Sequence, residues 1–201
     1  MSKIKICGIQ YPEEIKILNQ LLPDYIGFVF APSKRQITIK QAEKLKGLLS
    51  PQIKVVGVYV NSDIESIVYS VKAKSIDLVQ LHGDEDEGYI KELKRQINVP
   101  IIKVVRVDES MSLPEGDMDY YLFDKKSSKA YGGLGESFDW TLLKKIKKPY
   151  FLAGGIGIDN ITEALGYKPY CVDLSSKVET NGMKDKYKIQ QVLGKVRMNC
   201  G

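Results

Sequence analysis

The stretch KVVGVYVNSDIESIVYSVKAKSIDLVQLHG, residues 54–83, predicts a strand, a helix and a second strand in direct succession. It opens and closes with nearly continuous apolar runs, KVVGVYV and LVQLHG, which are typical of strands buried on both faces. Between these runs, apolar residues recur at the spacing of one helical face: Ile64, Ile67, Val68 and Val71. Because a helical crossover makes neighbouring strands parallel, residues 54–83 predict one unit of a parallel α/β fold.

The same alternation of strand and helix extends over the whole chain of 201 residues. Apolar runs that predict strands begin near residues 3, 25, 54, 78, 101, 120, 150 and 171. Eight strand–helix units predict a single domain over residues 1–201 that closes into a (β/α)8 TIM barrel. The alternative is an open doubly wound sheet, but no GxGxxG motif follows the first run.

Two local signals refine this α/β barrel. The chain is compact for a fold that typically takes about 250 residues. The segment ESMSLPEGDM, residues 109–118, carries proline, glycine and serine between the fifth and sixth strands. We therefore expect the fifth helix to be shortened or missing. Thr38 followed by Gln41 fits a capping box at the start of the second helix.

Composition and cysteine content limit the class of protein. The chain is 43% hydrophobic and 27% charged, with a net charge of +5. It has neither an apolar run long enough to span a membrane nor a secretory signal, and its three cysteines are widely spaced. We therefore expect a cytoplasmic protein without a disulfide framework, a zinc site or a membrane contact. The lysines are spread along the chain, which fits a small anionic partner better than nucleic acid.

Titratable side chains stand where the predicted strands end, and this end of a (β/α)8 barrel holds the active site. The ends of the first, fourth, sixth and eighth strands carry Cys7, His82, Asp124 and Asp173. A thiolate can accept a proton, and a carboxyl group in apolar surroundings can donate one. The residues alone leave simpler interpretations open: a space-filling Cys7, a structural His82, or an ion pair of Asp124 with a neighbouring lysine.

Glycine and serine at the last strand ends predict a phosphate site. Gly154 and Gly155 follow the seventh strand, where the main chain can approach a ligand closely. Ser175 and Ser176 follow the eighth strand, and phosphate-binding barrels place their site between these two loops. A further glycine cluster around Gly133 precedes a predicted helix start, whose amide groups favour an anion.

Taken together, these motifs resemble one known family. KICGI, GFVFAPSKR, VGVYVN, DLVQLHGDE, LFDKK, GGLGESFDW, LAGGI and VDLSSKVETNGMKD occur in the order found in the phosphoribosylanthranilate isomerase family, from Lys5 to about Ile189. The resemblance implies a barrel that converts N-(5-phosphoribosyl)anthranilate into 1-(2-carboxyphenylamino)-1-deoxyribulose 5-phosphate. This Amadori rearrangement belongs to tryptophan biosynthesis and takes no cofactor and no metal. The implied partner is a phosphorylated, anionic small molecule, and a barrel of this size can act as a monomer or a homodimer.

The resemblance also implies roles for the site residues. Cys7 corresponds to the general base and Asp124 to the general acid. Arg35 is expected to contact the anthranilate end of the substrate, and His82 to line the pocket. We further expect Asp173 to bind the substrate. The residues expected at the phosphate are Gly133, Gly154, Gly155, Ser175 and Ser176.

One departure from the family pattern lies in the GGLG loop, where Leu134 stands in place of an expected hydroxyl residue. The residues leave three alternatives to compare. A histidine-pathway phosphosugar isomerase does similar chemistry with paired aspartates, whereas the first strand here ends in Cys7. An indole-forming synthase needs lysine and glutamate inside its barrel. A non-catalytic barrel that binds a phosphorylated ligand needs the glycine loops but not both Cys7 and Asp124.

Overall fold

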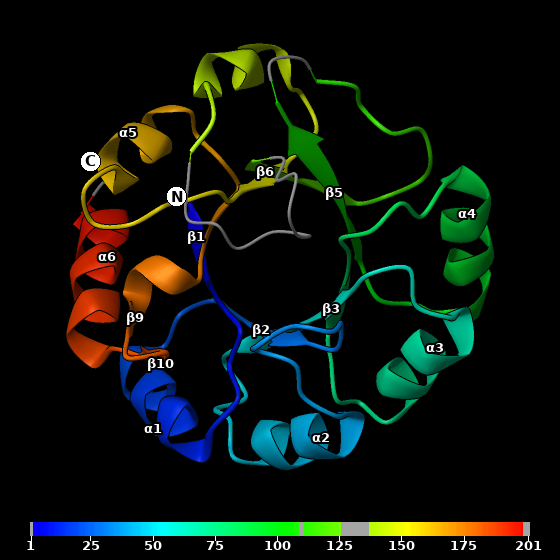
Figure 1. The fold of residues 1–201 in the computed structure, drawn as a ribbon, viewed down its shortest axis with the longest axis horizontal. Helices are drawn as coiled ribbons and strands as arrows, with labels where there is room; N and C mark the ends of the chain where they lie inside the picture. Colours follow the sequence, from blue (N-terminus) through cyan, green and yellow to red (C-terminus); the bar gives the residue numbers. More distant parts are fainter. Residues whose placement is uncertain (1, 109–110, 126–136, 199–201) are drawn as a thin grey trace.

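The computed structural model describes residues 2–108, 111–125 and 137–198. In these ranges eight parallel strands close into a barrel in chain order, and β1 pairs with β8. The strands are β1 (Lys3–Cys7), β2 (Tyr25–Val29), β3 (Lys54–Tyr59), β4 (Leu78–Leu81), β5 (Ile101–Val107), β6 (Tyr120–Lys125), β7 (Tyr150–Leu152) and β8 (Cys171–Leu174). Figure 1 shows this ring of strands with the helices outside it. The predicted (β/α)8 barrel is confirmed.

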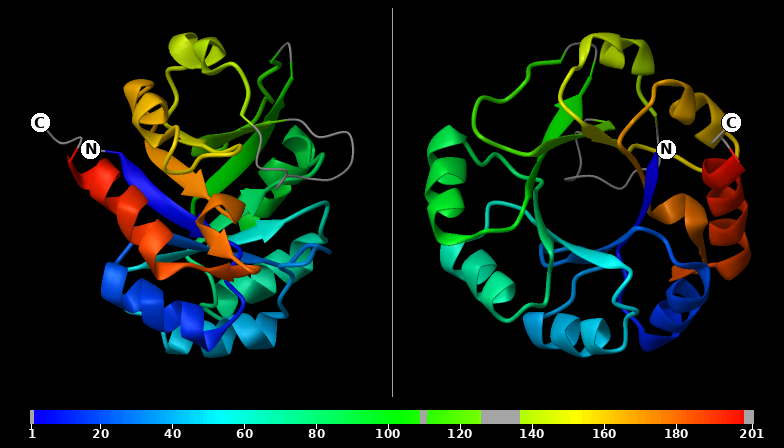
Figure 2. Two further views of the ribbon diagram at one scale, coloured as in Figure 1. Left: turned by 60° about the vertical axis from the view of Figure 1, so that its left-hand side comes forward. Right: turned by 180° about the vertical axis from the view of Figure 1, so that it is seen from behind.

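Helices cover the barrel around its circumference (Figure 1). The α-helices of the described ranges are α1 (Pro12–Leu21), α2 (Ile39–Gly47), α3 (Ile64–Lys72), α4 (Glu87–Gln96), α5 (Ile161–Gly166) and α6 (Lys186–Met198). Figure 2 shows α6, in red, beside α1, in blue, so that the last helix closes the ring next to the first. The helix starts follow local capping chemistry, and the predicted capping box is present: Thr38 Oγ1 accepts from Gln41 N at 3.2 Å, and Gln41 Oε1 accepts from Thr38 N at 2.8 Å.

Two crossovers depart from a regular strand–helix repeat. Between β5 and β6, the described residues 111–119 contain no helix, which confirms the expected loss of the fifth helix. Between β6 and β7, the described residues 137–149 contain a 3₁₀ helix, η1 (Trp140–Lys145), where a helix was expected. Asp139 caps it by accepting from Thr141 N at 2.9 Å. Pro149 follows closely and disfavours helical backbone at the residue before it, so little chain remains for a longer helix.

The chain after β8 adds two small elements to the barrel. A 3₁₀ helix, η2 (Ser176–Val178), leads directly into an antiparallel pair, β9 (Glu179–Thr180) and β10 (Met183–Lys184). None of the helices in the described ranges combines the length and the hydropathy of a membrane span.

The barrel interior changes from apolar to polar along its axis. Near the strand starts it is filled by side chains such as Tyr25, Leu78 and Phe151. Side chains of a strand alternate between its two faces, so Lys5 lies on the same face of β1 as Cys7. The polar residues nearer the strand ends therefore form a floor above an apolar plug.

Candidate active site

A cavity of about 760 Å³ lies at the carboxyl ends of the strands. Its lining includes nine of the ten residues predicted for the site, namely Cys7, Arg35, His82, Asp124, Gly154, Gly155, Asp173, Ser175 and Ser176. The tenth, Gly133, lies outside the described residues. One pocket thus brings together the residues predicted for proton transfer and four of the five predicted for the phosphate.

The thiol of Cys7 is accommodated by a glycine on the neighbouring strand. Cys7 pairs in register with Gly27 of β2. A Cβ atom at Gly27 would lie only 2.6 Å from Cys7 Sγ, so a larger residue would displace the sulfur. The sequence analysis missed Gly27, because its role depends on the register between two strands that are separated by a helix.

The groups around Cys7 shift the pKa of its thiol in opposite directions. Burial raises the pKa of the thiol above its ordinary value, while the Lys5 ammonium lowers it. Asp173 raises the pKa further, and Lys184 opposes that rise. The protonated thiol is therefore the main form of the unliganded site, and two lysines partly offset the cost of the thiolate.

Asp124 is the penultimate residue of β6, and its carboxyl group is turned into the cavity. Its Oδ1 accepts the backbone N–H of Lys125 at 2.9 Å, and its Oδ2 lies 3.6 Å from His82 Nε2. Burial raises the pKa of Asp124 to about 6, and the nearby Asp173 contributes to the rise. A carboxyl group with this pKa retains a protonated fraction near neutral pH, as a general acid requires.

A buried lysine organises the floor of the cavity. Lys5 Nζ donates to Asp173 Oδ2 at 2.7 Å and to Gln80 Oε1 at 2.9 Å. Burial alone would lower the pKa of Lys5, but the Asp173 carboxylate and Cys7 raise it above its ordinary value, so the ammonium persists. Gln80 Nε2 in turn lies 3.0 Å from His82 Nδ1. The floor is a continuous polar chain from β8 through β1 to β4.

A second buried ion pair holds the chain that follows His82. Glu85 Oε2 accepts from Lys103 Nζ at 2.6 Å and from Gly83 N at 3.0 Å. Lys103 Nζ also donates to the Gly83 carbonyl at 2.9 Å. This arrangement fixes the exit of β4 immediately beyond His82.

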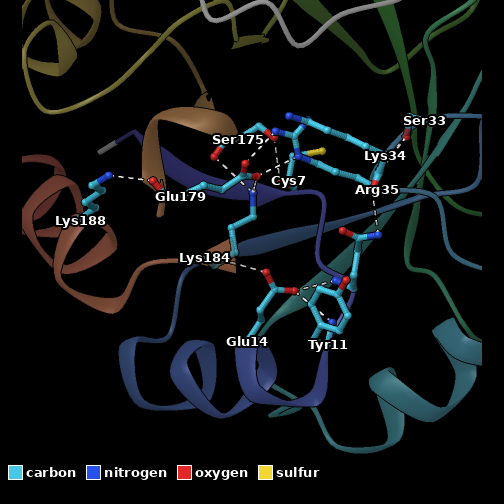
Figure 3. A network of polar contacts seen from close by, with 11 residues as sticks. Cys7, Tyr11, Glu14, Ser33, Lys34, Arg35, Ser175, Glu179, Lys184 and Lys188 are labelled. Atoms are coloured by element: carbon cyan, nitrogen blue, oxygen red, sulfur yellow. Dashed lines mark hydrogen bonds and ion pairs between the residues drawn. The ribbon is translucent and has the colours of Figure 1, made fainter. Parts of the chain in front are cut away.

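Arg35 reaches the cavity from the loop after β2 and is held by a carboxylate from the chain after β8 (Figure 3). Its Nε and Nη2 donate to the two oxygens of Glu179 at 2.8 and 2.9 Å. Lys184 Nζ shares Glu179, at 2.6 Å, and donates to the Ser175 carbonyl at 3.2 Å. Figure 3 shows this network beside Cys7, so it fixes the cavity wall next to the thiol.

The glycine that follows Cys7 allows Arg35 to lie against the main chain. Gly8 has a φ of +86°, which side-chain-bearing residues rarely adopt, and an added Cβ would lie 2.3 Å from Arg35 Cδ. The KICG motif therefore combines a thiol with a glycine on which the arginine stem packs.

The predicted phosphate loops after β7 and β8 also face the cavity. Gly154 and Gly155 have φ values of +84° and +63°, which glycine adopts without strain. The Ser175 hydroxyl donates to the Cys7 carbonyl at 3.2 Å, so it ties the loop after β8 to the end of β1. Asn160 supports the loop after β7 by donating to the Gly155 carbonyl at 3.1 Å.

Comparison with known proteins identifies the family. A family model described as N-(5'phosphoribosyl)anthranilate (PRA) isomerase matches residues 4–195. The chain belongs to the PRA isomerase family. The resemblance found in the motifs is therefore confirmed, and the chain is an isomerase.

The similarity to members of this isomerase family extends over nearly the whole chain. The N-(5'-phosphoribosyl)anthranilate isomerase of Endomicrobium trichonymphae is 52% identical over 190 residues, which cover 94% of this chain and 95% of that protein. The crystal structure of phosphoribosyl anthranilate isomerase from Thermus thermophilus matches with a TM-score of 0.86 at 28% identity, covering 98% of this chain and 99% of that one. A crystal structure of the enzyme in complex with reduced 1-(o-carboxyphenylamino)-1-deoxyribulose 5-phosphate has a TM-score of 0.81 at 28% identity, with coverages of 98% and 100%.

Several residues that build the site of this isomerase were missed by the sequence analysis. Lys5 and Gln80 precede Cys7 and His82 by two positions, so strand periodicity alone could have predicted that their side chains also point into the barrel. Glu179 and Lys184 lie within the VETNGMKD motif, but only the fold shows that Glu179 holds Arg35 and that Lys184 shares this carboxylate. Across the described ranges, no group of three or more His, Cys, Asp or Glu side chains is arranged to hold a metal ion.

Proposed function

We propose that the chain isomerises N-(5'-phosphoribosyl)anthranilate to 1-(2-carboxyphenylamino)-1-deoxyribulose 5-phosphate, with Asp124 as general acid and Cys7 as general base. One observation carries the assignment of roles. An acid whose pKa is raised to about 6 and a thiol from a non-neighbouring strand line the same cavity. Membership of the PRA isomerase family supports the reaction itself.

The acid step opens the ribose ring. The glycosylamine ring oxygen must gain a proton before its bond to C1 breaks, and Asp124 is the carboxyl group available to supply it. The raised pKa of Asp124 keeps part of the population protonated near neutral pH. Breaking this bond leaves a positively charged Schiff base between C1 and the anthranilate nitrogen.

The base step removes the proton from C2. The Schiff base makes this proton acidic, and the Cys7 thiolate accepts it to give an enol that tautomerises to the ketone product. The positive charge on the Schiff base favours a thiolate beside it, because an opposite charge lowers a thiol pKa. Lys5 acts in the same direction from the floor of the cavity.

The cavity suits the rest of the substrate. A volume of about 760 Å³ lies within the range of small-molecule sites. Lys34, Arg35 and Lys177 contribute positive charge to its lining, which favours the carboxylate and the phosphate of the substrate. We assign the anthranilate end to Arg35, pocket contacts to His82 and Asp173, and the phosphate to the loops at Gly133, Gly154, Gly155, Ser175 and Ser176. Because β1 and β8 both line the site, we propose that residues 1–201 act as one catalytic domain.

The test is an anthranilate-fluorescence assay with freshly prepared substrate. Wild type should convert the substrate, and Cys7→Ala and Asp124→Asn should each lower kcat by about 100-fold or more, the usual contribution of a general acid or base. Two controls match these changes in chemistry: Cys171→Ala, buried in the lower barrel, and Asp117→Asn, on the surface. Full activity in folded Cys7→Ala or Asp124→Asn would contradict that residue's role, and an inactive, folded wild type would contradict the reaction.

A further inference from the structure

The floor of the cavity contains a hydrogen-bond chain whose direction is fixed at one end. Asp173 Oδ2 lies 2.7 Å from Lys5 Nζ, which lies 2.9 Å from Gln80 Oε1. Gln80 Nε2 then lies 3.0 Å from His82 Nδ1. Lys5 and Gln80 are almost completely buried, at 0% and 1% exposure, so water cannot take the place of either partner.

The chemistry of these groups determines where the imidazole proton resides. An ammonium group only donates hydrogen bonds, so the amide oxygen of Gln80 must face Lys5. The amide nitrogen of Gln80 then faces His82, and because this NH2 group only donates, Nδ1 must accept. A neutral imidazole that accepts at Nδ1 carries its proton on Nε2.

His82 stays neutral because burial and the neighbouring cations disfavour its protonated form. Burial lowers the pKa of His82 to about 3, and the cations Lys5, Arg106 and Lys103 lower it in the same direction. The carboxyl group that faces it is Asp124, whose Oδ2 lies 3.6 Å from Nε2. Only the choice between two neutral tautomers is therefore left to the hydrogen-bond chain.

The two tautomers would affect Asp124 in opposite ways. An Nε2–H group stabilises the carboxylate that remains after proton donation, whereas a bare Nε2 lone pair stabilises the protonated acid. Among the described residues, Nε2 has no hydrogen-bond partner, and 3.6 Å is longer than a hydrogen bond. Catalytic hydrogen bonds are often long before substrate binds and shorten in the complex.

We propose that Lys5, acting through Gln80, is a positioning residue that holds His82 as the Nε2–H tautomer, so that the imidazole donates to the Asp124 carboxylate as it forms. This inference rests on the proposed role of Asp124 as the acid. Lys5 then serves the acid side of the cavity as well as the thiol beside it.

The first test reads the tautomer directly. His82 is the only histidine in the chain, so protein labelled with [¹⁵N]histidine gives the NMR signals of a single imidazole. In the free enzyme near neutral pH, we expect the proton on Nε2. Gln80→Glu replaces the amide with a group that accepts from both Lys5 and His82, so it should move the proton to Nδ1. Gln52→Glu, an exposed change of the same kind, should leave the spectrum unchanged.

Two results would overturn the proposal. A wild-type proton on Nδ1 overturns the proposal, and this holds even if no Gln80 variant folds. A folded Gln80→Glu whose imidazole stays neutral and keeps its proton on Nε2 also overturns it. The spectrum needs no substrate, so its result is independent of whether Asp124 is the acid, which the activity of Asp124→Asn decides.

The second test asks whether the tautomer matters for catalysis. Gln80→Met keeps the length of the side chain but leaves His82 Nδ1 without its donor, so both tautomers should be populated. Because the Nε2–H form is still part of the population, kcat of Gln80→Met should fall only about two-fold. In Gln80→Glu, where the proton lies on Nδ1, the hydrogen bond to the forming Asp124 carboxylate is lost, and kcat should fall about 10- to 100-fold with little change in KM, as for the loss of a hydrogen bond to a charged group. An unchanged kcat in a variant whose tautomer has shifted would overturn the catalytic role.

Discussion

Gly27 tests how the barrel makes room for the Cys7 thiol. A Cβ added at Gly27 would lie 2.6 Å from Cys7 Sγ and 3.1 Å from Cys7 Cα, whereas ordinary contacts begin at 3.4 Å. Because the second contact is to backbone, the strand must move together with the sulfur. We expect Gly27→Ala to lower the free energy of unfolding by about 1–3 kcal/mol, the usual cost of overpacking. It should lower kcat by about 100-fold, since a displacement of about 1 Å at a reacting group has an effect of that size.

The assay combines urea unfolding, followed by circular dichroism, with the fluorescence assay. In a double-mutant cycle, Gly27→Ala is combined with Cys7→Ala, which removes the sulfur that the added Cβ would meet. The destabilisation of the double variant should therefore be smaller than the sum of the two single effects by about 1 kcal/mol. Gly194→Ala in α6 is the control, because an added Cβ meets no described atom within 4 Å. This variant should keep the wild-type kcat, and its free energy of unfolding should increase by up to about 1 kcal/mol. An additive cycle, or a Gly27→Ala enzyme with full activity and stability, would refute the reasoning.

Three further predictions concern charge. The pKa of Asp124 is about 6 in the folded protein against an ordinary 3.8. The protonated carboxyl group therefore adds to the free energy of unfolding in full below pH 3.8, and this contribution is lost as pH rises through 6. As pH rises from 4 to 7, the free energy of unfolding of Asp124→Asn, measured with urea, should increase relative to that of wild type by up to about 3 kcal/mol. A difference between the two proteins that does not change with pH would contradict the raised pKa. The pH profile of kcat/KM should be nearly flat from about pH 6 to beyond pH 9, because Asp124 loses its proton as Cys7 gains thiolate, and a steep fall above pH 6 would argue against this pairing. Lys103→Met should lower the free energy of unfolding by about 3–5 kcal/mol in the same assay, because it leaves Glu85 buried without its cation. A decrease of less than about 1 kcal/mol would show that the ion pair does not stabilise the fold.

Residues 54–83 show why the fold was predictable from the sequence. Apolar periodicity and capping chemistry are local properties, and they placed β3, α3 and β4 without knowledge of the rest of the chain. The missing fifth helix followed from the composition of residues 109–118 in the same way. The shortening of η1 was not predicted, because it depends on how little chain separates the Asp139 cap from Pro149.

The site was predictable only in part. Cys7 and Asp124 could be found because strand ends in a barrel converge on one face. Gly27 could not, because its function lies in the register with Cys7, which long-range pairing determines. Glu179 was equally hidden, since nothing local indicates that it pairs with Arg35, 144 positions away in the chain.

An isotope effect tests most directly whether Asp124 is the acid and Cys7 the base. The measurement compares substrate carrying hydrogen or deuterium at C2 of the ribose unit, in Asp124→Asn and in Cys7→Ser, using the residual activity of each variant. If Cys7 removes this proton, its variant is limited by that step and should show a several-fold isotope effect on kcat. Asp124→Asn, limited by ring opening, should show almost none. The reverse pattern, with the large effect in Asp124→Asn, would contradict the assignment.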